Sequence, residues 1–177
     1  MRRTEQTTRM LKESMGTALL KMMEEKPVEK ISIEEMTAMA DVGRSTYFRH
    51  FKSKDDVLTF KIMCQFEDYL KGRGLDPASL DDEHLGRIVF DFFSTIKPEI
   101  ALIYKAGHSQ VFLDFFLRML EPNQKKALEQ LSSIQVSYYS QIFAYLCFGF
   151  FDTWVKRDFK ESSEELEALL VPETSQK

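Results

Sequence analysis

The sequence contains few of the residues that break helices or form tight turns. Its 177 residues include only seven glycines and five prolines, and it has no Asn-Gly pair of the kind that closes a β-hairpin. Hydrophobic residues make up 44% of the chain, which is enough to build a core. We therefore expect an all-α protein.

Cysteines and long apolar runs are also scarce. Cys64 and Cys147 are the only cysteines, and both fall within apolar helical patterns, which indicates buried reduced thiols more than a disulfide. No run of 18 or more apolar residues could form a membrane span, and the N-terminus is charged where a signal peptide would be apolar. These absences favour a cytoplasmic protein without a membrane partner.

Patterns of catalytic or metal-binding residues are missing as well. His50, His84 and His108 are scattered, and the chain has no His-Glu-x-x-His, Cys-x-x-Cys, glycine-rich phosphate loop or Gly-x-Ser-x-Gly motif. We expect no enzymatic activity, no cofactor and no metal.

The most informative stretch that is present covers residues 31–54, ISIEEMTAMADVGRSTYFRHFKSK. Ser32 and Glu35 have the spacing of a capping box, which predicts the start of a short helix. Residues 41–43 predict a turn, and a second short helix should begin near Arg44. The pattern is that of two helices joined by a tight turn.

The side chains of this segment divide between an inner and an outer face. Val42 is the expected apolar plug between the helices, and Gly43 can adopt backbone angles that the turn requires. Tyr47 and Phe51 lie four residues apart, so they share a face that can point inward. The opposite face carries side chains able to hydrogen-bond base edges or phosphates: Arg44, Ser45, Thr46 and Arg49.

A basic end follows the second helix. Ser53 has the position of an N-cap for the next helix, and Lys54 at that helix N-terminus is suited to a phosphate. Spacing alone leaves open whether the helix pair binds DNA or only packs in a core, and the basic outer face favours DNA. The candidate DNA-binding residues are Ser32, Arg44, Ser45, Thr46, Tyr47, Arg49, His50, Lys52 and Lys54.

The run ADVGRSTYFRHFKSKDDVL resembles the DNA-binding domain of the TetR family of bacterial transcriptional regulators, over about residues 5–70. Its core has the form T-[YF]-[YF]-x-[HY]-F-x-[SN]-K. The resemblance implies a three-helix helix-turn-helix DNA-binding domain at 1–71, with the motif at about 32–51. A helical dimerisation and ligand-binding domain at 72–177 would follow the break at Lys71-Gly72-Arg73-Gly74.

Two positions depart from the family pattern. The turn, usually Gly-Val-Ser, is Asp41-Val42-Gly43 here, so the usual serine cap of the second helix is missing. The second aromatic, often a phosphate-contacting tyrosine in the family, is Phe48, which cannot make that bond. Tyr47 is the candidate to replace it in part.

Apolar periodicity predicts further helices. The expected spans are 5–25 and 54–70, then 82–97, 98–107, 109–120 with a stop at Glu121-Pro122, a long helix 123–156 with one interruption, and a last helix from Ser162 or Ser163.

The long helix carries two apolar stripes. The first stripe is Leu131, Ile134, Tyr138, Ile142, Tyr145 and Gly149, and the second stripe is Tyr139, Phe143, Leu146, Phe150 and Trp154. One stripe can face the chain's own core and the other a second copy about a two-fold axis. The alternative is a central helix wholly buried in a monomer. The expected dimer contact is the second stripe with Leu166, Leu169 and Leu170.

The aromatic side chains of the second half of the chain, residues 72–177, allow two interpretations. They can simply form the core, or they can line a cavity for a small apolar or aromatic effector, as the resemblance implies. Polar anchors for such an effector would be Tyr104, His108, Tyr138 and Tyr145.

These expectations combine into one hypothesis with two alternatives. The hypothesis is a homodimeric regulator that binds palindromic double-stranded DNA and is released by an effector, as a repressor is. The first alternative is an activator, or a regulator that answers a protein partner. The second is a helical dimer that serves protein interaction only.

Overall fold

The structure, a computed structural model, describes residues 2–75, 82–127 and 131–170, and all regular elements in these ranges are helical, as predicted. None of these helices combines the length and apolarity needed to cross a membrane. In chain order they are α1 (Arg2–Met23), the 3-10 helix η1 (Val28–Lys30), α2 (Ile33–Met39), α3 (Arg44–His50), α4 (Lys54–Gly72), α5 (Asp82–Thr95), α6 (Lys97–Lys105), α7 (Gln110–Ala127), α8 (Ser133–Lys156) and α9 (Ser163–Leu170).

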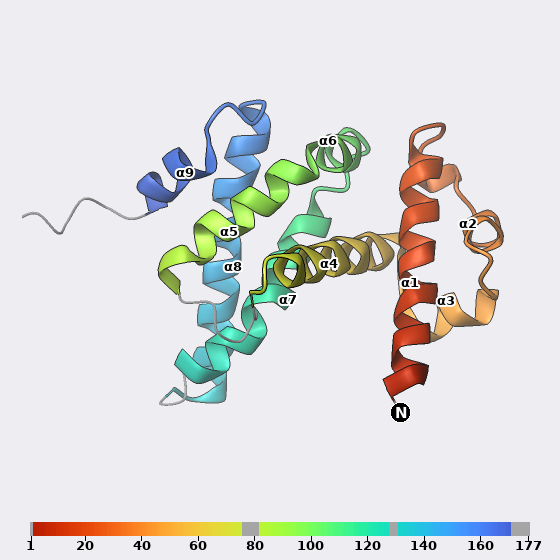
Figure 1. Cartoon of the computed structure of the whole chain (residues 1–177), viewed down its shortest axis with the longest axis horizontal. Coiled ribbons are helices and arrows are strands. Elements are labelled where there is room, and N and C mark those ends of the chain that lie inside the picture. The colour runs from red at the N-terminus through yellow and green to blue at the C-terminus, as the bar shows by residue number, and fades with distance from the viewer. Residues whose placement is uncertain (1, 76–81, 128–130, 171–177) are drawn as a thin grey trace, which may run out of the picture.

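Helix α4 connects the two ends of the molecule. Figure 1 shows α1, α2 and α3 at one end and α5, α8 and α9 at the other, with α4 running between them. It packs against α1 and also against α7. The buried side chains of both ends, including those of α4, belong to one continuous hydrophobic cluster.

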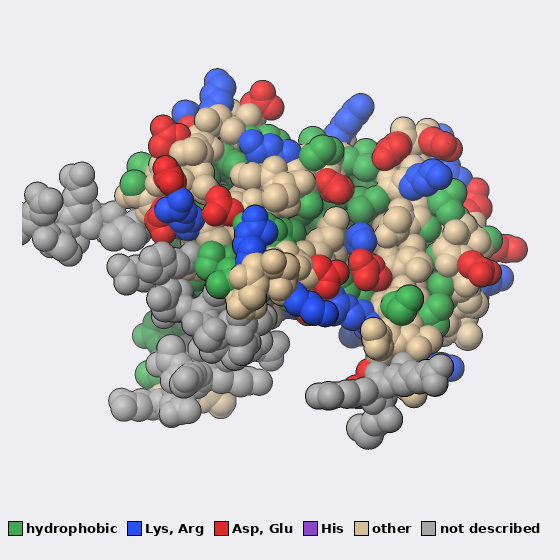
Figure 2. Space-filling model, in the orientation of Figure 1, with side chains coloured by type: hydrophobic (Ala, Val, Ile, Leu, Met, Phe, Trp, Pro, Cys, Tyr) green, Lys and Arg blue, Asp and Glu red, His purple; other side chains and the backbone are tan. Residues whose placement is uncertain are grey.

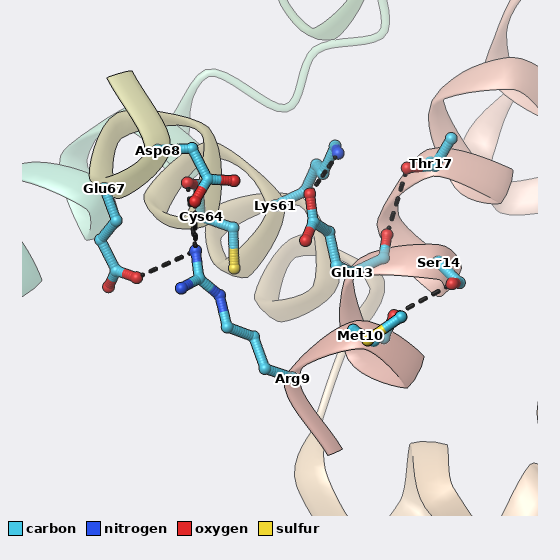
Figure 3. A network of polar contacts seen from close by, with 9 residues as sticks. All are labelled: Arg9, Met10, Glu13, Ser14, Thr17, Lys61, Cys64, Glu67 and Asp68. Carbon is cyan, nitrogen blue, oxygen red and sulfur yellow. Dashed lines mark hydrogen bonds and ion pairs between the residues drawn. The ribbon is translucent and has the colours of Figure 1, made fainter. Parts of the chain in front are cut away.

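Ion pairs also tie α1 to α4 (Figure 3). The guanidinium of Arg9 lies 3.2 Å from the Glu67 carboxylate and 3.1 Å from that of Asp68. The ammonium of Lys61 lies 2.9 Å from the carboxylate of Glu13. The Arg9 pairs are exposed and add little stability, whereas the Lys61–Glu13 pair is part-buried and less screened by water.

Helix starts that were predicted from serine caps are confirmed. In each, the serine Oγ accepts a hydrogen bond from the backbone N–H three residues later, and the acidic side chain at that later position accepts one from the serine N–H. The pairs are Ser32–Glu35, Ser53–Asp56 and Ser162–Glu165.

Two predicted boundaries are wrong. Helix α7 does not stop at Glu121-Pro122 but continues to Ala127, although a proline inside a helix removes a backbone hydrogen bond and crowds the preceding turn. Residues 123–127 therefore belong to α7. Helix α8 begins later than expected, at Ser133, where Ser132 and Gln135 form a capping box.

Most of the aromatic side chains of the second half form the core. Phe151 of α8 is fully buried, with ring centroids 4.4 Å from Phe93 and 4.9 Å from Phe112. Trp154 is 1% exposed, and its indole N–H donates a 3.0 Å hydrogen bond to the Glu161 carbonyl. The interpretation that these aromatic residues form the core is therefore correct for most of them.

Both cysteines are free thiols. Cys64 is buried as predicted, whereas Cys147 is half-buried. Burial raises the pKa of the Cys147 thiol to about 11, so it is protonated at neutral pH.

Replacing Phe151 by alanine should lower the free energy of unfolding by about 3–5 kcal/mol, because a cavity opens in the aromatic core. Phe48→Ala is the matched control. That ring is 64% exposed, and its loss should change stability by less than about 0.5 kcal/mol. Urea unfolding followed by circular dichroism measures both. Equal losses in the two variants would contradict this account of the core.

Candidate nucleic-acid interface

The turn between α2 and α3 is held by its backbone. The N–H of Val42 donates a 2.9 Å hydrogen bond to the Thr37 carbonyl, and the Val42 side chain is buried as predicted. The left-handed residue of the turn is Asp41, with φ of 54°, and not Gly43, whose φ of −64° and ψ of 137° suit any residue. The prediction for Gly43 was therefore wrong, and Asp41 fills the role because aspartate tolerates this region better than most residues.

Helix α3 is anchored by two aromatic side chains and not by a cap. Gly43 at its N-cap offers no side-chain hydrogen bond, as the sequence indicated. Tyr47 and Phe51 are 5% and 7% exposed, with ring centroids 6.0 Å apart, and Phe51 packs edge-on against Phe60 of α4 at 5.8 Å. The predicted inner face is confirmed.

The outer face of α3 is exposed over most of the predicted positions. Thr46 is half-buried, and the exposed residues are Ser32, Arg44, Ser45, Arg49, His50 and Lys52. These side chains are the polar, basic surface of this end of the molecule. We call Arg44, Ser45, Thr46, Phe48 and Arg49 the α3 outer face.

Tyr47 does not belong to this surface. Its ring is buried, so it cannot take over the phosphate contact that the resemblance suggested, and this expectation was wrong. Phe48, whose ring has no hydroxyl for a phosphate, is 64% exposed and reaches solvent. Its position next to inward-facing Tyr47 could have indicated this, because adjacent helical residues point in different directions.

Lys54 is also not a free phosphate clamp. Its ammonium donates a 2.6 Å hydrogen bond to the backbone carbonyl of Val28, which pins η1 to the start of α4. The first turn of α4 carries the carboxylates of Asp55 and Asp56, which would repel a phosphate at that helix end. Lys52 remains exposed nearby and keeps its predicted role as a candidate.

The charge of this end is mixed. Arg44 lies 3.8 Å from the Glu34 carboxylate, and both side chains are exposed, so water screens the pair. Figure 2 shows acidic and basic side chains interspersed on the visible face of this end. Residues 1–60 as a whole hold 11 lysines and arginines against 10 acidic residues, whereas the rest hold 13 against 18. Residues 1–60 therefore repel the negative charge of DNA less than the rest of the chain does.

His50 adds a hydrogen-bonding group and not a fixed charge. Although His50 is exposed, some loss of hydration lowers the pKa of its imidazole below the ordinary value, and the positive charges of Lys12 and Arg49 lower it further. The ring is mainly neutral at pH 7, so it can offer an N–H to a phosphate without a full positive charge.

His108 links the two ends of the molecule. It lies in the turn between α6 and α7, with Nδ1 2.7 Å from the Asp55 carboxylate and Nε2 3.4 Å from that of Glu29. Nearby, the guanidinium of Arg118 in α7 lies 3.0 Å from the Asp56 carboxylate. These contacts join the second half to η1 and to the first turn of α4.

The predicted effector anchors do not come together. His108 is engaged as described, and the hydroxyl of Tyr104 donates a 3.2 Å hydrogen bond to Asp152. Tyr138 and Tyr145 are 69% and 58% exposed on α8. These four side chains therefore line no common cavity, because the two α8 residues point to the outside of the bundle.

Helix α8 presents a broad apolar surface. Both predicted stripes are exposed over most of the helix, and its buried side chains are Ala144, Phe151 and Trp154. The exposed residues, which we call the α8 face, are Ile134 (69%), Tyr138 (69%), Tyr139 (51%), Ile142 (55%), Phe143 (49%), Tyr145 (58%) and Leu146 (65%). The alternative of a helix wholly buried within one chain is excluded.

Part of the predicted dimer set lies elsewhere. Trp154 and Leu166 are buried in the chain's own core, and Phe150 is half-buried with its ring 5.8 Å from Phe90. Leu169 is 66% exposed, and the Leu170 side chain lies outside the described residues. Trp154 turns inward because α8 packs its C-terminal end against α5 aromatics, which stripe geometry alone did not reveal.

Comparison with solved structures finds the same fold in the crystal structure of Lin0861 from Listeria innocua. The TM-score is 0.68 and 18% of the residues are identical, over 93% of this chain and 88% of that chain. No family model matches the sequence, and no curated protein matches it. At this identity the likeness concerns the fold alone.

The two serines at the starts of α2 and α3 should behave differently. Ser32→Ala removes the cap of α2 and should cost about 1 kcal/mol of stability. Ser45→Ala, at an exposed position of α3, should change stability by less than about 0.5 kcal/mol. Thermal unfolding of the two variants tests this, and a Ser45→Ala loss as large as that of Ser32→Ala would show that Ser45 is structural.

Proposed function

We propose that the chain is a homodimeric regulator of the TetR type that binds palindromic double-stranded DNA with α3, and that it acts as a repressor. The observation that carries the proposal is the division of α3. Tyr47 and Phe51 hold it in the core, while Arg44, Ser45 and Arg49 of the α3 outer face are exposed and Thr46 is half-buried. A short helix presented in this way fits a major groove, where base edges offer distinct donors and acceptors.

The outer face has the chemistry that this role needs. Arg44 and Arg49 can form paired hydrogen bonds with guanine, and Ser45 and Thr46 can bond bases or phosphates. Within the described residues Arg44 pairs with Glu34, and because both side chains are exposed this weak pair leaves the guanidinium available to a base.

Arg44→Ala should weaken binding to a selected duplex by about 1–3 kcal/mol if the guanidinium pairs with guanine. The duplex is obtained by in vitro selection from a random library with the intact protein, and affinity is measured by fluorescence anisotropy. Arg157→Ala is the matched control, because Arg157 is an exposed arginine at the end of α8 and should not affect affinity. Unchanged affinity of Arg44→Ala would remove Arg44 from the base contacts.

The α8 face supports the dimer. It places seven large apolar side chains in solvent along one helix, and Leu169 of α9 is exposed as well. Contiguous exposed apolar surface of this kind usually marks an interface. A second copy is the occupant that DNA binding requires, since a two-fold pair of α3 helices can bind half-sites about 34 Å apart.

Leu146→Asp should convert the protein to a monomer, because the new carboxylate would be buried against the partner's apolar surface. Analytical ultracentrifugation measures the state, and the monomer should bind the selected palindrome far more weakly. Met10→Asp places the same charge on an exposed methionine of α1 and should remain dimeric. A Leu146→Asp protein that sediments like the wild type would contradict the α8 interface.

Release by a small apolar or aromatic effector is the form of regulation we propose. Contacts of His108 and Arg118 with the first turn of α4 support it, because a ligand that moves the α6–α7 turn would shift α4 and α3 with it. An activator of the same fold, or a regulator that answers a protein partner, would use the same connection. A helical dimer for protein interaction alone would use only the α8 face and would select no DNA sequence.

A further inference from the structure

Phe48 is the residue of the α3 outer face that hydrogen bonding cannot explain. Its ring is 64% exposed and touches Tyr47 edge-on, with centroids 5.3 Å apart. It has no hydroxyl or N–H to offer to a phosphate or a base edge. The hydrophobic effect favours moving such an exposed ring out of water and against another apolar group.

Arg44 lies on the same side of α3 as Phe48. The two residues are four apart, so they lie one above the other on the same side of α3. Ser45, three residues before Phe48, flanks it on the exposed surface. Any helix orientation that brings the Arg44 guanidinium to a base edge therefore brings the Phe48 ring into the same groove.

The major groove offers one apolar group, the C5-methyl of thymine. We infer that Phe48 contacts this methyl and makes the protein selective for thymine at one position of each half-site. The inference rests on the proposed function and deepens it, since it identifies what α3 recognises besides hydrogen-bonding base edges. Phosphates and hydrated backbone offer the ring no comparable contact.

The helix geometry also sets where this thymine lies. One turn of an α-helix rises about 5.4 Å, whereas neighbouring base pairs are about 3.4 Å apart. Arg44 and Phe48 should therefore reach base pairs one or two steps from each other. A half-site in which a guanine and a thymine are separated by that spacing fits both side chains.

The test replaces thymine by deoxyuridine, which differs only in lacking the methyl group. Each thymine of the selected palindrome is exchanged in both half-sites at once, and the affinity of the intact protein is measured by fluorescence anisotropy. Losing one buried methyl should weaken binding about fourfold per half-site, or roughly 15-fold for the two together. The loss should occur at one thymine position, within two base pairs of a guanine.

Two variants assign the effect to Phe48. Phe48→Ala should bind more weakly and should no longer distinguish thymine from deoxyuridine at that position. Arg157→Ala, at the end of α8 and outside the α3 outer face, should keep the full distinction. Phe48 is exposed, so the alanine variant should fold, and its unfolding curve verifies this.

A second base substitution distinguishes the contribution of the methyl group from that of the rest of the base. Changing the sensitive thymine to cytosine should weaken binding, and 5-methylcytosine should recover part of the loss, because it restores the methyl without the thymine O4. No recovery would oppose a methyl contact.

Failure of the inference can be told from failure of the proposed function. If selection enriches no duplex, DNA binding itself is wrong. If a duplex is bound but deoxyuridine has no effect at any position, or if Phe48→Ala retains the wild-type distinction, the DNA-binding proposal stands and the role of Phe48 is overturned. A uniform loss in Phe48→Ala without base dependence would place the ring on sugars instead.

Discussion

Burial of Tyr47 and Phe51 beneath α3 is the interaction on which the candidate interface depends. Tyr47 lies in this seven-residue helix and Phe51 is its C-cap, and with both rings buried the opposite side of the helix is exposed. Because Gly43 provides no side-chain cap, aromatic packing holds α3 in place. The same packing excludes Tyr47 from the surface and leaves Phe48 on it. Which side chains of α3 can contact a partner therefore depends on which of them this packing buries.

Helix α4 gives this local arrangement a connection to the rest of the chain. In its first turn, Lys54 bonds to η1, and the Asp55 and Asp56 carboxylates contact His108 and Arg118. Along its length α4 packs against both α1 and α7. Helices α3 and α8 lie toward opposite ends of this connection (Figure 1). A displacement of the second half would therefore act on α3 through α4, as regulation by an effector requires.

Local features of the sequence predicted the fold well. Serine caps located the starts of α2, α4 and α9, and the spacing of Tyr47 and Phe51 predicted the inner face of α3. Features that depend on distant contacts were not predictable in this way. Trp154 is buried because α5 supplies Phe90, and Lys54 is occupied because Val28 offers a carbonyl. Arg44 and Arg49 are therefore exposed as predicted, whereas Tyr47 is buried and Lys54 is bonded to a backbone carbonyl.

Hydrogen–deuterium exchange with and without a selected duplex tests the central claim most directly. The account predicts that DNA protects the backbone of residues 43–52, while residues 134–146 on the α8 face exchange equally in both states. Protection of the α8 residues without protection of α3 would contradict it, because α3 would then not be the element that meets DNA.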